Sequence, residues 1–186
     1  LVSEDDRKTW GDRIAALKTQ FPFEMPDAGD PRSHFGLIRT IAACLDDEAA
    51  IATDVGQHQM WVAQAYPLRR PRQWLTSGGL GTMGFGVPAA IGAALAEPKR
   101  TVVCFTGDGS IMMNIQELVT AAEENVNLKI VLMDNASLGL VHQQQTLFYG
   151  ERLFASKFKS APDLIKIAQG FGITAVDLDL AANPCA

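Results

Sequence analysis

A chain of 186 residues is long enough for one domain with a substantial core, and 47% hydrophobic with 20% charged residues argues against disorder. A formal net charge of -5 argues against nucleic acid as the main partner, because phosphate binding requires a basic face. No apolar run is long enough to span a membrane, and the first residues lack a basic segment followed by an apolar one. We therefore expect a soluble cytoplasmic protein that acts on neither nucleic acid nor membranes.

The first thirty residues differ from the rest of the chain. Residues 3–20 can form a helix with Trp10, Ile14 and Leu17 on one side. Residues 21–31 contain three prolines and a glycine, which cannot continue that helix. We interpret residues 1–30 as a linker and a helix from an upstream region, residues 31–180 as one domain, and residues 181–186 as the tail of a truncated chain.

Helical and extended patterns alternate after this linker. The predicted helices cover residues 33–45, 59–65, 87–96, 110–125 and 162–170. The predicted strands cover residues 49–53, 101–106, 128–133 and 173–178, and residues 78–86 form a glycine-rich loop. The strand at 101–106 lacks polar alternation, as expected when helices cover both faces, and the strand at 128–133 is expected to be a second buried strand. The order predicts an α/β fold with an open, mainly parallel sheet and helices on both faces.

Three smaller patterns predict structure and not binding. The helix over residues 110–125 is expected to bury one face, made of Ile111, Ile115, Leu118, Val119 and Ala122. Cys44 and Cys104 lie in apolar patterns and are expected to be small buried side chains. The basic cluster Arg69, Arg70 and Arg72 is interleaved with prolines, and we interpret it as a solvated loop.

Polar residues follow three of the predicted strands, where parallel sheets bind their ligands. Asp108 and Asn135 follow two of these strands and are separated by one helix and one strand, the minimal crossover. If the strands are neighbours, their ends lie about 5 Å apart. Carboxylate and amide oxygens suit Mg²⁺, and the N–H groups of a helix that begins at Gly109 and Ser110 favour a phosphate. Each motif alone is more typical of a turn, but together they predict a Mg²⁺-diphosphate site.

The same residues carry a family resemblance. Gly107-Asp108-Gly109 followed by Asn135 resembles the thiamine-diphosphate signature, which opens Gly-Asp-Gly and ends Asn-Asn. Residues 55–61, 76–86 and 147–149 narrow the resemblance to acetolactate synthases, also called acetohydroxyacid synthases, and residues 138–145 are most similar to the bacterial isozyme I type. Asp134 departs from the pattern, because it stands where the first Asn is usual.

The resemblance implies roles for individual residues. Asp108 and Asn135 bind Mg²⁺ through their side chains, and Ser137 through its backbone carbonyl. Met83 is an apolar wedge that bends the cofactor so that its ylid can form. Gln144 lines the acceptor pocket, where many members carry tryptophan. The remaining cofactor-binding positions are Gly56, Gln57, His58, Gly81, Gly109, Ser110 and Leu140.

The resemblance also implies the activity of the full-length enzyme. That enzyme decarboxylates pyruvate and condenses the hydroxyethyl carbanion with a second 2-ketoacid, either pyruvate or 2-ketobutyrate, in branched-chain amino acid biosynthesis. Its cofactors are thiamine diphosphate, Mg²⁺ and FAD, and it is a homodimer of large subunits with a small regulatory subunit. The catalytic glutamate and the FAD site belong to other domains, so this chain alone is expected to be inactive.

Two other interpretations remain open from the sequence. Residues 79–84 satisfy the dinucleotide fingerprint G-x-G-x-x-G, which would make the chain an NAD-dependent dehydrogenase. Residues 70–75 are a poor strand to precede that fingerprint. If Asp108 were the acid that binds the ribose, Gly109, Ser110 and Asn135 would be left without a role. Alternatively, the chain is a domain that binds a diphosphate weakly and catalyses nothing.

Overall fold

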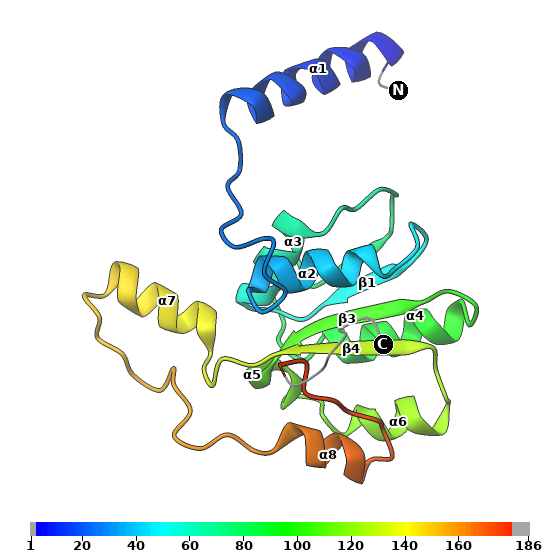
Figure 1. Ribbon diagram of the computed structural model, residues 1–186, viewed down its shortest axis with the longest axis vertical. Coiled ribbons are helices and arrows are strands. Elements are labelled where there is room, and N and C mark those ends of the chain that lie inside the picture. The colour runs from blue at the N-terminus through cyan, green and yellow to red at the C-terminus, as the bar shows by residue number, and fades with distance from the viewer. Residues whose placement is uncertain (1–2, 180–186) are drawn as a thin grey trace.

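A four-stranded parallel sheet forms the centre of the computed structural model, which describes residues 3–179 (Figure 1). The strands are β1 (Ala50–Thr53), β2 (Trp74–Thr76), β3 (Val102–Gly107) and β4 (Leu128–Met133). Their order in the sheet is β2-β1-β3-β4, and all neighbours run parallel. The predicted α/β fold with an open parallel sheet is confirmed.

Helices cover both faces of the sheet, as predicted. Alternate side chains of β1 and β3 point to opposite faces: Ala52 and Cys104 pack in one core cluster, and Ile51 and Phe105 in the other. The second cluster lies under α2 (His34–Ala43) and α3 (Gln57–Ala65). The first is covered by α4 (Gly86–Ala96), α6 (Glu117–Glu123) and α8 (Leu164–Gly170). Figure 1 shows α2 and α3 on one side of the strands and α6 and α8 on the other.

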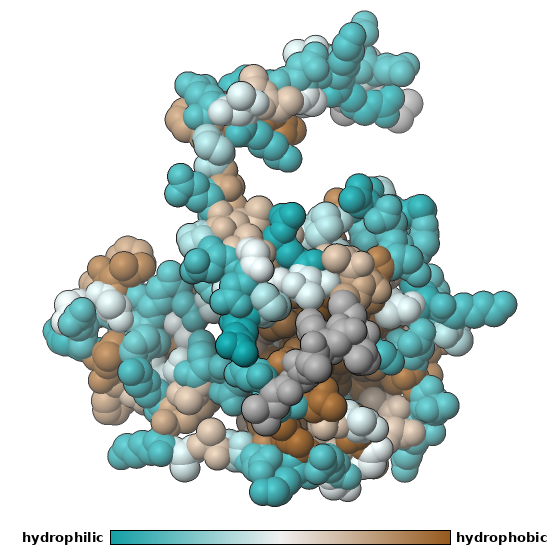
Figure 2. All heavy atoms as spheres, in the orientation of Figure 1, coloured by the Kyte–Doolittle hydropathy of each residue, from teal (hydrophilic) through white to brown (hydrophobic). Residues whose placement is uncertain are grey.

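The predicted first helix is present as α1 (Glu4–Gln20), and it stands apart from the sheet (Figures 1 and 2). Ser3 and Asp6 form a capping box at its start. Trp10, Ile14 and Leu17 are between 43% and 58% exposed, so the apolar side of α1 is largely open within residues 3–179, apart from Arg13 of the same helix, which lies over the Trp10 ring. No helix in these residues is long and apolar enough to cross a membrane. The proposed division into residues 1–30 and 31–180 stays a prediction, and residues 181–186 lie outside the described residues.

The helix predicted over residues 110–125 is wrong in its continuity. It is divided into α5 (Asp108–Ile111) and α6, and N–H groups between them bond to the carbonyl three residues back, as in Met113 to Ser110 at 3.1 Å. The Asn114 side chain donates to the Gly84 carbonyl at 2.7 Å, which draws this turn toward the glycine-rich loop. Val119, predicted to lie on the buried face, is exposed.

The predicted strands agree less well toward the end of the chain. β4 has the predicted bounds, but only Val131 in it is buried, because β4 pairs on one side only within the described residues. The strand predicted over residues 173–178 is wrong: no ladder forms there, and Val176 is 66% exposed. Residues 74–76, in contrast, form the short strand β2. The expectation that residues 70–75 are a poor strand is therefore wrong for residues 74 and 75.

Helix α7, the two cysteines and the basic loop complete the description of the fold. An additional helix, α7 (Gly139–Phe148), follows β4 and was not predicted. Cys104 is buried as expected, whereas Cys44 is exposed at the end of α2. The basic loop is exposed as expected, and Arg69 forms an exposed ion pair with Asp47 at 3.0 Å.

Candidate functional site

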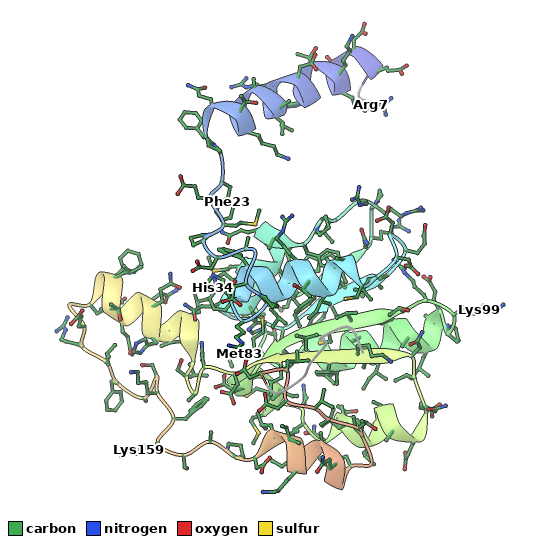
Figure 3. All side chains as sticks on the ribbon, viewed as in Figure 1. Arg7, Phe23, His34, Met83, Lys99 and Lys159 are labelled. Atoms are coloured by element: carbon green, nitrogen blue, oxygen red, sulfur yellow. The ribbon has the colours of Figure 1, made fainter. Side chains whose placement is uncertain are left out.

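The carboxyl ends of β1, β3 and β4 meet around a cavity of about 170 Å³. Gly107 and Met133 are register partners in the sheet, so the residues that follow them, Asp108 and Asp134, leave the same edge side by side. Every residue predicted to bind the cofactor or the metal lines this cavity: Gly56, Gln57, His58, Gly81, Met83, Asp108, Gly109, Ser110, Asn135, Ser137 and Leu140. Met83 lies beside the ends of β3 and β4 (Figure 3).

Asp108 and the loop after β4 hold each other in place. The two carboxylate oxygens of Asp108 accept hydrogen bonds from the Gly109 N–H at 2.8 Å and the Ser137 N–H at 3.1 Å. Burial raises the pKa of the Asp108 carboxyl, and the neighbouring Asp134 carboxyl raises it further. The Asn135 Oδ1 accepts from the N–H and the hydroxyl of Ser137, at 3.1 and 2.8 Å. The oxygens of Asp108 and Asn135 therefore meet at Ser137.

Asp134 has a local structural role. Its Oδ1 accepts a hydrogen bond from the Ala136 N–H at 2.9 Å, and Ala136 has a positive φ of 51°. This turn brings Asn135 and Ser137 together on the cavity side, while Asp134 itself is exposed and does not line the cavity. A carboxylate at this position thus adds negative charge beside Asp108 without entering the cavity.

His58 is a buried side chain on the wall of the cavity. A Cβ on Gly56 would lie 2.8 Å from its Cε1, and a Cβ on Gly107 would lie 3.0 Å from its Nδ1, so both glycines make room for the ring. The His58 Nε2 is buried and has no hydrogen-bond partner among the described residues. Burial lowers the pKa of His58 to about 4, against the opposing effect of Asp54. The ring is therefore neutral near pH 7, with a nitrogen that has no partner.

Asp54 is an important residue of the site to which the sequence analysis gave no role. It is fully buried at the end of β1, and its Oδ1 accepts from the N–H groups of Val55 and Gly84, both at 2.8 Å. Its Oδ2 accepts from the Gly86 N–H at 3.1 Å. These bonds fix the loop that carries Met83. A carboxylate directly after an apolar strand was the available signal for this role.

Comparison with known protein families identifies the group to which this site belongs. Residues 54–183 match the model of the thiamine pyrophosphate enzyme, C-terminal TPP binding domain; thiamine pyrophosphate is thiamine diphosphate. The chain belongs to this family of thiamine-diphosphate enzymes. The matched residues include all those that line the cavity. Membership favours the diphosphate site over the dinucleotide fingerprint at residues 79–84.

Individual relatives are similar over nearly the whole chain. The chain is 60% identical over 184 residues to the acetolactate synthase isozyme 1 large subunit of Escherichia coli, which covers 99% of this chain and 33% of the relative. It is 50% identical over 171 residues to the probable acetolactate synthase large subunit of Methanococcus aeolicus, and 44% identical over 164 residues to the isozyme 2 large subunit of Escherichia coli. The chain thus spans about a third of the length of these relatives.

The residues of the cavity fit the cofactor of this family. Asp108, Asn135 and the Ser137 carbonyl are hard oxygen donors of the type that Mg²⁺ requires. The described residues contain no group of three or more His, Cys, Asp or Glu side chains that could hold a metal. Besides the Asp108 carboxylate, a metal here would therefore depend on amide and carbonyl oxygens and on the phosphate oxygens of a ligand. The buried, unpartnered His58 Nε2 is a further polar atom that a bound ligand could satisfy.

The structure adds detail to the positions of Ser110 and Gln144, whose roles stay predictions. The Ser110 hydroxyl donates to the Val55 carbonyl at 2.8 Å, which leaves the backbone of the short α5 as the part available to a phosphate. Gln144 is exposed on α7 and does not line the main cavity. It lines a neighbouring cavity with Gln145, Tyr149 and Arg152, and Val141 borders both cavities. The structure therefore places Gln144 next to the cofactor cavity and not in it.

Proposed function

We propose that this chain is the cofactor-binding module of an acetolactate synthase large subunit and that its main cavity holds Mg²⁺-thiamine diphosphate. The observation that carries the proposal is the meeting of Asp108, Asn135 and Ser137 at the ends of β3 and β4, beside His58 and Met83. The family match and the names of the relatives support the same assignment.

Each wall of the cavity has a separate task in this proposal. The Asp108 and Asn135 side chains and the Ser137 carbonyl hold Mg²⁺, while Gly56, Gln57, His58, Gly109 and Ser110 surround the diphosphate. Met83, held in place through Asp54, supports the bent cofactor from the apolar side with Gly81 and Leu140. When bound, thiamine diphosphate supplies a carbon nucleophile that can accept the two-carbon unit of pyruvate.

The activity of the whole protein is also part of the proposal. It is the decarboxylation of pyruvate and the condensation of the retained two-carbon unit with pyruvate or 2-ketobutyrate. The relatives are named acetolactate synthase large subunits, which supports a small regulatory subunit as a partner. An FAD site, a homodimer of large subunits and a cytoplasmic location follow from the same resemblance.

The 186-residue chain alone is proposed to form no acetolactate. It spans about a third of the relatives' length, and the catalytic glutamate of the family is expected in a region beyond this third. Formation of acetolactate from pyruvate by the purified chain, free of host enzyme, would contradict this part of the proposal.

Cofactor binding by the chain tests the central claim. Thiamine diphosphate is titrated with Mg²⁺ and with EDTA, and tryptophan fluorescence is followed because Trp61 lines the cavity. We expect saturable binding with Mg²⁺ only. Asp108→Ala should abolish the Mg²⁺-dependent binding because it removes the charged ligand. Asn135→Ala should only weaken the Mg²⁺-dependent binding, because it removes a neutral oxygen.

The exposed Asp12 on α1 offers a matched control, because Asp12→Ala removes the same carboxylate far from the cavity. Asp12→Ala should bind as the unaltered chain does. Unchanged affinity in Asp108→Ala at limiting Mg²⁺ would contradict the metal site. A fluorescence response to NADH with none to thiamine diphosphate would favour the dehydrogenase.

A further inference from the structure

A chain of side-chain amides connects the loop after β4 to helix α7. The Asn135 Nδ2 donates to the Gln57 Oε1 at 3.3 Å, and the Gln57 Nε2 donates to the Gln143 Oε1 at 3.0 Å. Gln57 begins α3, Asn135 follows β4, and Gln143 lies in the middle of α7. We call Asn135, Gln57 and Gln143 the amide relay. It joins the start of α3 to two positions 78 and 86 residues further along the chain, one after β4 and one in α7.

The direction of the amide relay is set at its Ser137 end. Ser137 offers two donors, its N–H and its hydroxyl, and both bond to the Asn135 Oδ1. This turns the Asn135 NH₂ group toward Gln57, so Gln57 must present its oxygen to Asn135 and its NH₂ group to Gln143. Gln143 is thus the final acceptor. Without that acceptor, the Gln57 amide keeps only the Asn135 NH₂ group as a partner that opposes its rotation.

Gly139 keeps the space that the amide relay occupies. A Cβ at this position would lie 2.2 Å from the Gln57 Oε1 and 2.7 Å from the Asn135 Nδ2. Any side chain here would displace Gln57. Because Gly139, the first residue of α7, has no side chain, Gln57 can occupy this space. Gln143 lies about one helical turn further along α7 and accepts the hydrogen bond from Gln57.

Helix α7 depends on polar tethers of this kind. None of its residues is buried, yet Gly139, Leu140 and Val141 form part of the cavity wall. A second tether is Gln145, whose amide bonds to both the N–H and the carbonyl of Phe154, at 3.2 and 2.9 Å. Gln145 attaches α7 to the loop that follows it, whereas Gln143 attaches it to the cavity.

We propose that Gln143 is a positioning residue for the Mg²⁺-diphosphate site, acting through Gln57 and Asn135. This inference rests on the proposed function, because it assigns Gln57 to the diphosphate and Asn135 to the metal. With one Gln57 N–H held by Gln143, the second is free to donate to a phosphate oxygen. The Asn135 Oδ1 is held at the same time on the Ser137 side, where the metal is proposed to bind.

The amide relay can be tested without any ligand in the 20.1 kDa chain. The side-chain NH₂ signals of Gln57 and Asn135 are followed by NMR in Gln143→Leu, which removes the acceptor, and in Gln143→Glu, which keeps one. Gln143→Leu should shift both pairs of signals, and Gln143→Glu should leave the Asn135 pair unshifted. Unshifted signals of both residues in Gln143→Leu would overturn the proposal.

Cofactor binding then shows whether Gln143 positions Gln57 and Asn135 or only attaches α7 to the cavity. In Gln143→Leu, half-saturation of thiamine-diphosphate binding should require roughly two- to fivefold more Mg²⁺, the effect of one exposed neutral hydrogen bond. Gln145→Leu also loosens α7 but leaves the amide relay intact, so its Mg²⁺ requirement should not change. An equal increase in both variants would mean that Gln143 only tethers α7, and would overturn the proposal.

The two proposals fail in different ways. If the unaltered chain bound no thiamine diphosphate under any Mg²⁺ concentration, the proposed function would fail, and the NMR signals of the ligand-free chain would still decide on the amide relay. Gln64→Leu, at an exposed position of α3, controls for the substitution itself and should match the unaltered chain in both measurements.

Discussion

The carboxylate of Asp54 accepts a hydrogen bond from the Gly84 N–H at 2.8 Å, across thirty residues of sequence. The same carboxylate accepts from the N–H groups of Val55 and Gly86. One fully buried side chain thus connects the end of β1 to the loop that carries Met83 and to the start of α4. Within residues 3–179, this buried carboxylate is compensated by backbone donors and forms no ion pair with a cation.

Removal of the Asp54 carboxylate should destabilise the protein and the cofactor cavity together. Asp54→Ala leaves three N–H groups without their acceptor in a buried position, so we expect the free energy of unfolding to fall by about 3 kcal/mol. Urea denaturation of the chain measures it, with Asp12→Ala as an exposed control. A fall of less than about 1 kcal/mol would show that water or other acceptors replace the carboxylate.

Much of the site could be predicted because it follows from the order of strands. Asp108 and Asn135 each follow a strand, and the separation of these strands by one helix made them neighbours in the sheet. The register partners Gly107 and Met133 confirm this reasoning. Local sequence was sufficient because the carboxyl ends of adjacent parallel strands must meet.

The features that escaped prediction depend on contacts between distant residues. The interruption between α5 and α6 accompanies the bond from Asn114 to the Gly84 carbonyl, which no local pattern reveals. Residues 173–178 have strand-forming composition but pair with no strand among the described residues, and propensity alone does not make a ladder. The amide relay joins Gln57 to Gln143 across 86 residues of sequence, beyond the reach of any spacing rule.

Two glycines of the same helix should respond to alanine in opposite directions. A Cβ on Gly86 would lie 2.7 Å from the Asp54 backbone nitrogen, which cannot move without distorting the end of β1. A Cβ on Gly92 would meet nothing within 4 Å. Gly92→Ala should raise the free energy of unfolding by about 0.5–1 kcal/mol through helix propensity, and Gly86→Ala should lower it by about 1–3 kcal/mol through overpacking. Parallel urea titrations measure both, and a stabilised Gly86→Ala would refute the close contact with Asp54.

Buried His58 should make the stability depend on pH below neutrality. Its pKa is lowered from 6.5 to about 4, so the unfolded chain binds the proton more readily than the folded chain between these values. The stability from neutral His58 is therefore fully present above about pH 6.5 and is lost as the pH falls toward 4. Between about pH 7 and pH 5, the unaltered chain should lose about 2 kcal/mol more than His58→Gln does, since each pKa unit corresponds to about 1.4 kcal/mol. Asp54, the charged group that opposes the shift, is present in both chains, and parallel pH profiles would contradict the assignment to His58.

Gln144 is predicted to keep the choice of acceptor weak in a full-length protein that carries this chain. Its exposed amide lies in the cavity next to that of the cofactor, where it retains water and offers little apolar contact to a ketoacid side chain. The extra methylene of 2-ketobutyrate, if buried, is worth roughly 1 kcal/mol, or about fivefold in rate ratio. Gln144→Trp should supply that apolar wall and raise the preference for 2-ketobutyrate over pyruvate by roughly this factor. A competition assay with both ketoacids measures the ratio of acetohydroxybutyrate to acetolactate. Gln144→Leu separates bulk from aromatic character, and an unchanged ratio in both variants would mean that another residue sets the selectivity.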